Sequence, residues 1–267
     1  MPAILCPSCH KLISDDVPRC HHCGQIRPGM FGLASQLRKL GLRLDFPHLI
    51  TVVCGALYLL CLAIDPGAIL QPQGMMDILS PSGRASFDVG ASGTIPVFRA
   101  GRWWTVFTAI YLHGSLLHIF FNMMWVRQLG PVVEELFGPY RLFVIFTVAG
   151  VVGFIASTMM GSSLTLGASG SIFGLLAAAI VYGRRVGSDM FTRQYLQWAG
   201  MVFIFGLIMP GIDNWAHGGG FVGGYATAWL FSRTPNDREG LSAYVLAGVC
   251  AVITVLAFVL QLFSAFG

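Results

Sequence analysis

Seven apolar segments, separated by more polar connections, occupy most of the sequence after residue 48. Only 10% of the 267 residues are charged and 55% are hydrophobic, whereas soluble domains carry about 25% charged residues. The segments fall at roughly 48–64, 104–126, 142–160, 169–182, 196–210, 214–231 and 242–266. We therefore expect an all-α polytopic membrane protein. Two segments, 169–182 and 196–210, are shorter than the ~20 residues of a full crossing, so some helices should begin below the bilayer surface.

The basic residues fall mostly on one side of this arrangement. Arg84, Arg99 and Arg102 lie in the long 65–103 connection, and the other 13 of the 16 lysines and arginines lie on the opposite side. Because cytoplasmic loops carry an excess of Lys and Arg, we expect a multi-pass protein of the cell (inner) membrane. Its N-terminus should be cytoplasmic and its C-terminus outside. The sequence opens without an apolar run, so we expect no cleavable signal peptide. The net charge of +4 does not indicate a nucleic-acid partner.

Two Cys-x-x-Cys pairs mark residues 1–29 as a separate unit. Cys6 and Cys9 form the first pair, and Cys20 and Cys23 form the second. Each pair can place two thiolates on one metal ion, and four thiolates complete a tetrahedral zinc site. A unit this small cannot build a hydrophobic core, so the metal would supply most of its folding free energy. We predict a cytoplasmic zinc ribbon that could bind a cytoplasmic partner. Two disulfides are the alternative, which a cytosolic location disfavours.

An amphipathic linker is expected at 30–47, before a membrane domain at 48–267. Its leucines share one helical stripe, and its basic residues lie elsewhere: Leu33, Leu37, Leu40 and Leu44 against Arg38, Lys39 and Arg43. This pattern is typical of a helix that lies on an anionic membrane surface. A disordered tether is an equally good interpretation.

A serine and a histidine lie on two different apolar segments. Ser169 stands between Gly167 and Gly170 where a helix of small residues opens, and free N–H groups at such an opening can bind developing negative charge. His217 opens the segment 214–231. For either residue alone, close helix packing or a structural hydrogen bond is the better explanation. Both are predicted at the outer ends of their spans, however, and a pair at one depth indicates a serine protease that works within the bilayer.

The predicted span 104–126 carries more polar side chains. His118 and Asn122 are four residues apart and so share one face of a helix. Polar side chains inside a span are costly and usually face a functional cavity, and both residues can donate hydrogen bonds to an oxyanion. His113 precedes His118 by five residues and points off that face, so we expect it to have a structural role.

Small residues line one face of each of the two segments that carry the serine and the histidine. On the first, the face is formed by Gly170, Gly174 and Ala178, and on the second by His217, Gly220 and Gly224. Such faces let helix backbones approach closely in lipid, which a short Ser–His contact requires. Phe173 lies one turn after Ser169 on the same face.

This combination resembles the rhomboid family of intramembrane serine proteases. The resemblance covers roughly residues 48–231. The matching residues are His113, His118 and Asn122, then Gly167 to Gly170 around Ser169, then Ala216 and His217 followed by Gly220 and Gly224, together with Glu134 and Gly138 in a Glu-x-x-x-Gly turn. It implies a six-helix core, to which the segment 242–266 adds one C-terminal transmembrane helix.

The resemblance also implies the chemistry. Ser169 would be the nucleophile and His217 the general base, in a dyad without a carboxylate. The oxyanion hole would consist of His118, Asn122 and the Ser169 backbone N–H. His113, Gly167, Gly170, Phe173 and Gly220 would support the site. Substrates would be membrane proteins cut in or near their transmembrane segments, and catalysis would need no cofactor.

Two departures from the family pattern stand out. The family usually has Trp-Arg before the helix that carries His118, whereas Arg102 here precedes Trp103 and Trp104, so the contacts of this arginine should be rebuilt. Phe173 replaces a tyrosine that stacks on the histidine in some relatives.

Two other functions compete with proteolysis. One is a catalytically inactive relative that binds membrane proteins, which the intact Ser169 and His217 disfavour. The other is a transporter or channel. That function would predict acids or charge pairs within the membrane, but Asp213 alone lies near the outer ends of the spans from 169 to 231.

Overall fold

The computed structural model describes residues 3–6, 9, 11–14, 17–24, 45–70, 78–209, 211–233 and 239–266. The predicted amphipathic linker at 30–47 lies almost wholly outside the described residues. The N-terminal unit contains one antiparallel hairpin of β1 (Ala3–Leu5) and β2 (Leu12–Ser14), in which Ile4 pairs with Ile13.

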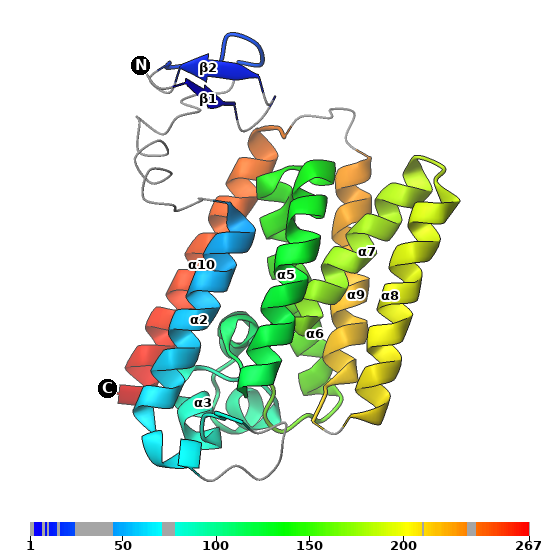
Figure 1. Ribbon diagram of the computed structural model, residues 1–267. Coiled ribbons are helices and arrows are strands. Elements are labelled where there is room, and N and C mark those ends of the chain that lie inside the picture. Colours follow the sequence, from blue (N-terminus) through cyan, green and yellow to red (C-terminus); the bar gives the residue numbers. More distant parts are fainter. Residues whose placement is uncertain are drawn as a thin grey trace.

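Seven long helices form most of the remaining described structure. They are α2 (Phe46–Ile64), α5 (Leu116–Phe137), α6 (Pro139–Met159), α7 (Ser169–Arg185), α8 (Asp189–Ile208), α9 (Asn214–Ser232) and α10 (Leu241–Phe266). Figure 1 shows them as one bundle, with α2 and α10 at one edge and α8 at the other. The expected all-α polytopic fold, six core helices plus a C-terminal helix, is confirmed.

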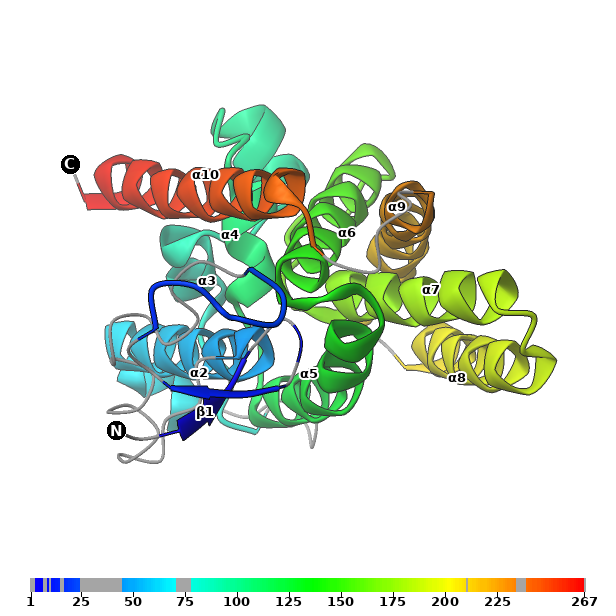
Figure 2. The same ribbon diagram turned by 90° about the horizontal axis from the view of Figure 1, so that it is seen from above.

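Burial distinguishes the helices that can face lipid from the one they enclose. By length and apolarity, α2, α6 and α10 could each cross a membrane alone, as could α5 together with the bent segment before it. The 17-residue α7 is buried over nearly all of its length, and Figure 2 shows it among α5, α6, α8 and α9. It can therefore be short and rich in small residues, because protein rather than lipid surrounds it.

One predicted span is wrong in its bounds. Residues 104–126 are not a single helix: α4 (Thr105–Thr108) and η5 (Ala109–Tyr111) end at a break and meet α5 at 90°. The break has a local cause. Ser115 adopts an extended conformation and its hydroxyl accepts a hydrogen bond from the His118 N–H at 3.2 Å, which caps a new helix. The span then continues to Phe137, and His113 precedes the helix instead of lying within it.

The other corrected span is 196–210. The helix α8 begins earlier, at Asp189, after the Ser188 side chain caps its first turn. Its first two turns carry the polar residues Asp189, Arg193 and Gln194. These turns therefore do not belong to the apolar segment from which the span was predicted. The helix is therefore 20 residues long and is not a short span.

A region of short helices occupies the end of the bundle where α7 and α9 begin (Figure 1), and we call it the re-entrant region because its last part turns by 90° into α5. It contains η2 (Pro66–Leu70), α3 (Gly83–Val89), η4 (Ile95–Arg99), α4 and η5. Two backbone hydrogen bonds between Ser92 and Thr165 join it to the connection that leads into α7. The long predicted loop 65–103 is thus largely structured in its described part.

The helices α6, α7 and α9 meet at backbone distance. A Cβ atom on Gly220 of α9 would lie 2.1 Å from the Gly170 carbonyl oxygen of α7, and one on Gly224 would lie 2.2 Å from the Gly174 Cα. On α6, a Cβ on Gly153 would lie 2.6 Å from the Ala216 oxygen. No side chain fits at these contacts, so glycine sets the spacing of α6, α7 and α9.

Candidate active site

Ser169 is the first residue of α7, and its position is fixed by the turn before it. Gly167 has φ +131°, a conformation that residues with a side chain rarely adopt. Its N–H donates to the Ala109 carbonyl of η5 at 2.9 Å. Ser169 is half-buried, and it opens a helix whose first-turn N–H groups have no partner in a preceding turn. The serine therefore lies where backbone donors can bind an anion.

His217 lies in the first turn of α9 and is 3% exposed. Its Nδ1 is 3.0 Å from Asn214 Oδ1. Because an amide oxygen only accepts hydrogen bonds, this contact places the proton on Nδ1 and leaves Nε2 with a free lone pair. The Phe173 ring stacks on the imidazole, with centroids 4.4 Å apart and planes 18° apart. Ring orientation and tautomer both suit a base.

The first turns of α7 and α9 are brought together by the contact between Gly170 and Gly220 described above. A Cβ on Gly170 would in turn lie 3.1 Å from the oxygen of Ala216, the residue before His217. Among the described residues, no hydrogen bond joins Ser169 Oγ to His217. Catalytic hydrogen bonds are often long without substrate and shorten when it binds.

His118 faces the turn that carries Ser169. Its Nδ1 accepts a hydrogen bond from the Gly114 N–H at 3.3 Å, so the ring proton lies on Nε2. A Cβ on Gly167 would lie 2.7 Å from His118 Nε2 and 4.0 Å from Ser169 Oγ. Gly167 therefore lies between the two groups, and only its lack of a side chain lets them share this space.

The other two polar residues predicted on that span have different surroundings. Asn122 is 5% exposed, and its Nδ2 donates to the His118 carbonyl at 2.8 Å, which leaves one amide proton for another acceptor. His113 is 1% exposed, its ring lies 5.2 Å from that of His118, and neither of its nitrogens has a partner among the described residues. The roles predicted for both residues stay predictions.

Sequence reasoning missed the roles of two residues at the start of α9. Asn214 precedes His217 by three positions, and this helical spacing was an available signal. Asp213 caps the helix by accepting from the N–H groups of Trp215 and Ala216, both at 3.1 Å, and its other oxygen accepts from the Ser157 hydroxyl of α6. Burial raises the pKa of the Asp213 carboxyl, but hydrogen bonds, first from Ser157, outweigh burial and hold it below its usual value.

The four N-terminal cysteines form a compact cluster. Their sulfur atoms all lie within 4.8 Å of one another, with 3.6 Å between Cys6 and Cys23 and 3.7 Å between Cys9 and Cys20. These separations exceed a disulfide bond of about 2.05 Å. Desolvation raises the pKa of Cys20, but the backbone N–H groups of His22 and Cys23 outweigh it and lower that pKa to about 6. A thiolate is the form that binds metal.

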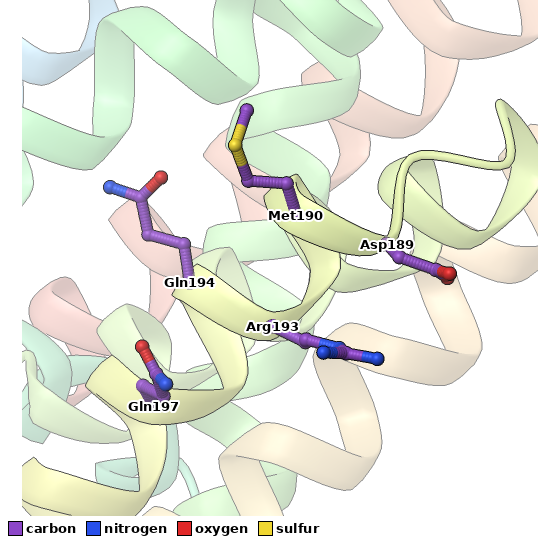
Figure 3. Close-up of a pocket in the computed structure, with 5 residues that line it drawn as sticks. All are labelled: Asp189, Met190, Arg193, Gln194 and Gln197. Atoms are coloured by element: carbon purple, nitrogen blue, oxygen red, sulfur yellow. The ribbon is translucent and has the colours of Figure 1, made fainter.

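A hollow lies at the start of α8, and Figure 3 shows the residues that line it. It is lined by Asp189, Met190, Arg193, Gln194 and Gln197, all from α8. Ser169 begins α7 and Asp189 follows the far end of that helix. The hollow is therefore separated from Ser169 by the length of α7 and is not part of this site.

Several known proteins are similar to this chain. RHOMBOID-like protein 1 of Arabidopsis thaliana is 29% identical over 185 residues, which cover 65% of this chain and 47% of that protein. Rhomboid protease GluP of Bacillus subtilis is 36% identical over 132 residues, or 48% of this chain and 26% of that protein. Rhomboid-type serine protease 2 of Emericella nidulans is 28% identical, over 53% of this chain and 30% of its own length. The chain therefore spans half or less of the length of each of these three relatives.

The family comparison covers the candidate site. The rhomboid domain matches residues 100–234, about half of the chain, and this range contains Ser169, His217, His118 and Asn122. The chain belongs to the rhomboid family.

Proposed function

We propose that this protein is an intramembrane serine endopeptidase that cleaves membrane proteins in or near their transmembrane segments. Relatives named as proteases support a proteolytic function. The observation that carries the proposal is the convergence of Ser169 and His118 on Gly167, beside a His217 whose Nδ1 is held by Asn214. A nucleophile, a base and a donor then share one end of the bundle.

The proposed reaction follows the serine protease scheme. Ser169 Oγ attacks the scissile carbonyl carbon while His217 Nε2 accepts the hydroxyl proton. Negative charge develops on the substrate oxygen, where His118 Nε2–H, the Ser169 backbone N–H and the second Asn122 amide proton can donate. The imidazolium then protonates the leaving amine, and the peptide bond breaks. Water, deprotonated by His217, hydrolyses the acyl-enzyme and releases Ser169.

Asn214 and Phe173 take the place of a third catalytic group in this proposal. In a triad, a carboxylate holds the histidine in the tautomer whose Nε2 can accept a proton. Here the amide oxygen of Asn214 accepts from Nδ1–H, and the Phe173 ring restricts rotation of the imidazole. Asn214 carries no charge, so it orients the ring but stabilises the imidazolium less than a carboxylate would.

Two alternatives are testable against this proposal. An inactive relative would bind membrane proteins without cleaving them. A transporter would need an ionisable group free to bind an ion, but Asp213 already accepts three hydrogen bonds.

The deciding experiment is cleavage of a model transmembrane substrate in detergent by the parent, Ser169→Ala and Ser171→Ala. Ser171 is 1% exposed on the same helix and is the matched control. Loss of cleavage in Ser169→Ala alone supports the protease function. Equal turnover by the parent and both variants refutes it.

We further propose that residues 1–29 bind one structural zinc ion through Cys6, Cys9, Cys20 and Cys23. Sulfur atoms about 2.3 Å from a tetrahedral zinc lie about 3.8 Å apart, which agrees with the separations of 3.6 and 3.7 Å. The ion would stabilise the ribbon and take no part in catalysis. The proposed organisation remains ribbon, linker at 30–47 and membrane domain at 48–267. In this proposal the ribbon faces a cytoplasmic partner, and Ser169 lies near the outer face of the cell membrane.

A further inference from the structure

The C-terminal helix α10 lies outside the matched rhomboid domain, but it is bonded to the re-entrant region. Gln261 is 1% exposed, and its Nε2 donates to the carbonyls of Phe87 at 3.1 Å and Asp88 at 2.9 Å. Both carbonyls belong to the last turn of α3, where helix carbonyls lack partners. Its Oε1 accepts from Trp104 Nε1 at 3.0 Å. One buried side chain thus joins α10 to both α3 and the start of α4.

Arg102 makes a second connection, in which this residue, which precedes α4, donates and α10 accepts. Its Nη2 donates to the Ser264 carbonyl in the last turn of α10 at 2.8 Å, and its guanidinium lies 4.5 Å from the centre of the Phe87 ring. A cation at a helix C-terminus is favoured by the helix dipole. Arg102, which stands before the two tryptophans instead of after one, therefore binds the C-terminal helix in this chain.

The other end of α10 is also held by the core. Glu239, two residues before the helix, accepts from the Arg141 N–H in the first turn of α6 at 2.7 Å. It fits against Gly138, where a Cβ would lie 2.3 Å from the Glu239 carboxyl carbon. The helix is therefore tied to the bundle at both ends, and Figure 2 shows it lying along α4 and α6.

The region that α10 holds is bonded directly to the turn that carries Ser169. The Ala109 carbonyl accepts from the Gly167 N–H at 2.9 Å, and Ser92 and Thr165 exchange two backbone hydrogen bonds. Trp104 lies five residues before Ala109. The connection from Gln261 to the Ser169 turn thus passes through one short helical segment.

We propose that Gln261 is a positioning residue that holds residues 83–112, most of the re-entrant region, in place. Through the hydrogen bond between Ala109 and Gly167, these residues hold the turn that positions Ser169. The inference rests on the proposed protease function. An error of about 1 Å in the position of a reacting group can lower a rate roughly 100-fold. Loss of the Gln261 contacts should therefore reduce turnover even though this residue touches no substrate.

The test uses the full-length protein and three variants. Gln261→Leu removes all three hydrogen bonds, and Trp104→Phe removes one. Ala247→Val is the control, because Ala247 is buried where α10 packs on Phe143 and Val144 of α6, away from the re-entrant segment. The readouts are kcat and KM for a transmembrane substrate, the rate of labelling by a fluorophosphonate, the melting temperature, and hydrogen exchange of residues 83–112.

For Gln261→Leu we expect faster exchange in 83–112, kcat and labelling rate lowered roughly 10- to 100-fold, and KM within about 3-fold of the parent. Trp104→Phe should have the same effects at smaller size, and it remains informative if Gln261→Leu does not fold. Ala247→Val should lower the melting temperature without changing kcat.

Any of three results would overturn the inference. One is parent-like kcat and labelling in Gln261→Leu or Trp104→Phe, and another is unchanged exchange of 83–112. A proportional fall of kcat with melting temperature across all three variants would also overturn it, since that would mark general destabilisation. An unlabelled, inactive parent would instead refute the proposed function, and the exchange data alone would still test whether Gln261 holds the segment.

Discussion

Replacement of Gly220 by alanine should separate the proposed nucleophile from its base by a distance the structure defines. A Cβ at this position would lie 2.1 Å from the Gly170 carbonyl oxygen, whereas real Cβ atoms essentially never approach within 3.0 Å. The obstructing atom is backbone, so a side-chain rotation cannot relieve the clash. The helices α7 and α9 must therefore move apart by roughly 1 Å at the turns that carry Ser169 and His217, and this should lower kcat roughly 100-fold.

The assay is kcat and KM on a transmembrane substrate for Gly220→Ala and for Gly218→Ala. Gly218 lies two residues earlier on the same helix, and a Cβ there would meet nothing within 4 Å. Both changes raise helix propensity by about 1 kcal/mol, so they differ mainly in the contact with α7. Gly218→Ala should keep the parent kcat and melt at the same or a higher temperature. Equal kcat for the parent and Gly220→Ala would refute the idea that glycine contact sets the Ser–His distance.

The remaining predictions concern the base, the oxyanion donors and the metal. Asn214→Leu should lower kcat at least roughly 10-fold, because His217 loses the acceptor that keeps its proton on Nδ1. Asn214→Asp keeps an acceptor for Nδ1–H and should retain most activity. Similar kcat values for the two variants would show that Asn214 has no role in the mechanism. Asn122→Ala should lower kcat roughly 100- to 1,000-fold with little change in KM, and His118→Ala should behave similarly. His113→Ala should lower the melting temperature instead. If Asn122→Ala and His118→Ala keep kcat within a few-fold of the parent, backbone N–H groups must form the oxyanion hole. Metal analysis of the reduced full-length protein should give one zinc per chain, and Cys20→Ser should lower this number; a parent value near zero would exclude the zinc ribbon.

The fold could be predicted from the sequence wherever apolarity and helix boundaries coincide. The helices α2, α6 and α10 are continuous apolar runs, and glycine spacing indicated the close faces of α7 and α9. Apolarity failed at 104–126 because apolar residues lie on both sides of the bend, at 106–112 before it and at 119–121 after it. The signal that marks the bend is Gly114 and Ser115 before His118, a local cap rather than a change in hydropathy.

Contacts to distant backbone atoms could not be predicted at all. Gln261 binds carbonyls more than 170 residues away, and a carbonyl carries no mark in a sequence. Within the site, His217 and Ser169 could be named from their glycine neighbours. Asn214, which holds the His217 ring, was overlooked because an amide beside a histidine at a helix start is usually an ordinary capping residue.

Mapping of a fluorophosphonate adduct tests whether Ser169 is a nucleophile activated by His217. The full-length protein is labelled in detergent, digested, and its modified peptide sequenced by mass spectrometry. We expect one adduct per chain on Ser169, abolished in Ser169→Ala and strongly slowed in His217→Ala, with Ser171→Ala labelled like the parent. An adduct on another serine, or undiminished labelling of Ser169→Ala, would show that Ser169 is not the nucleophile.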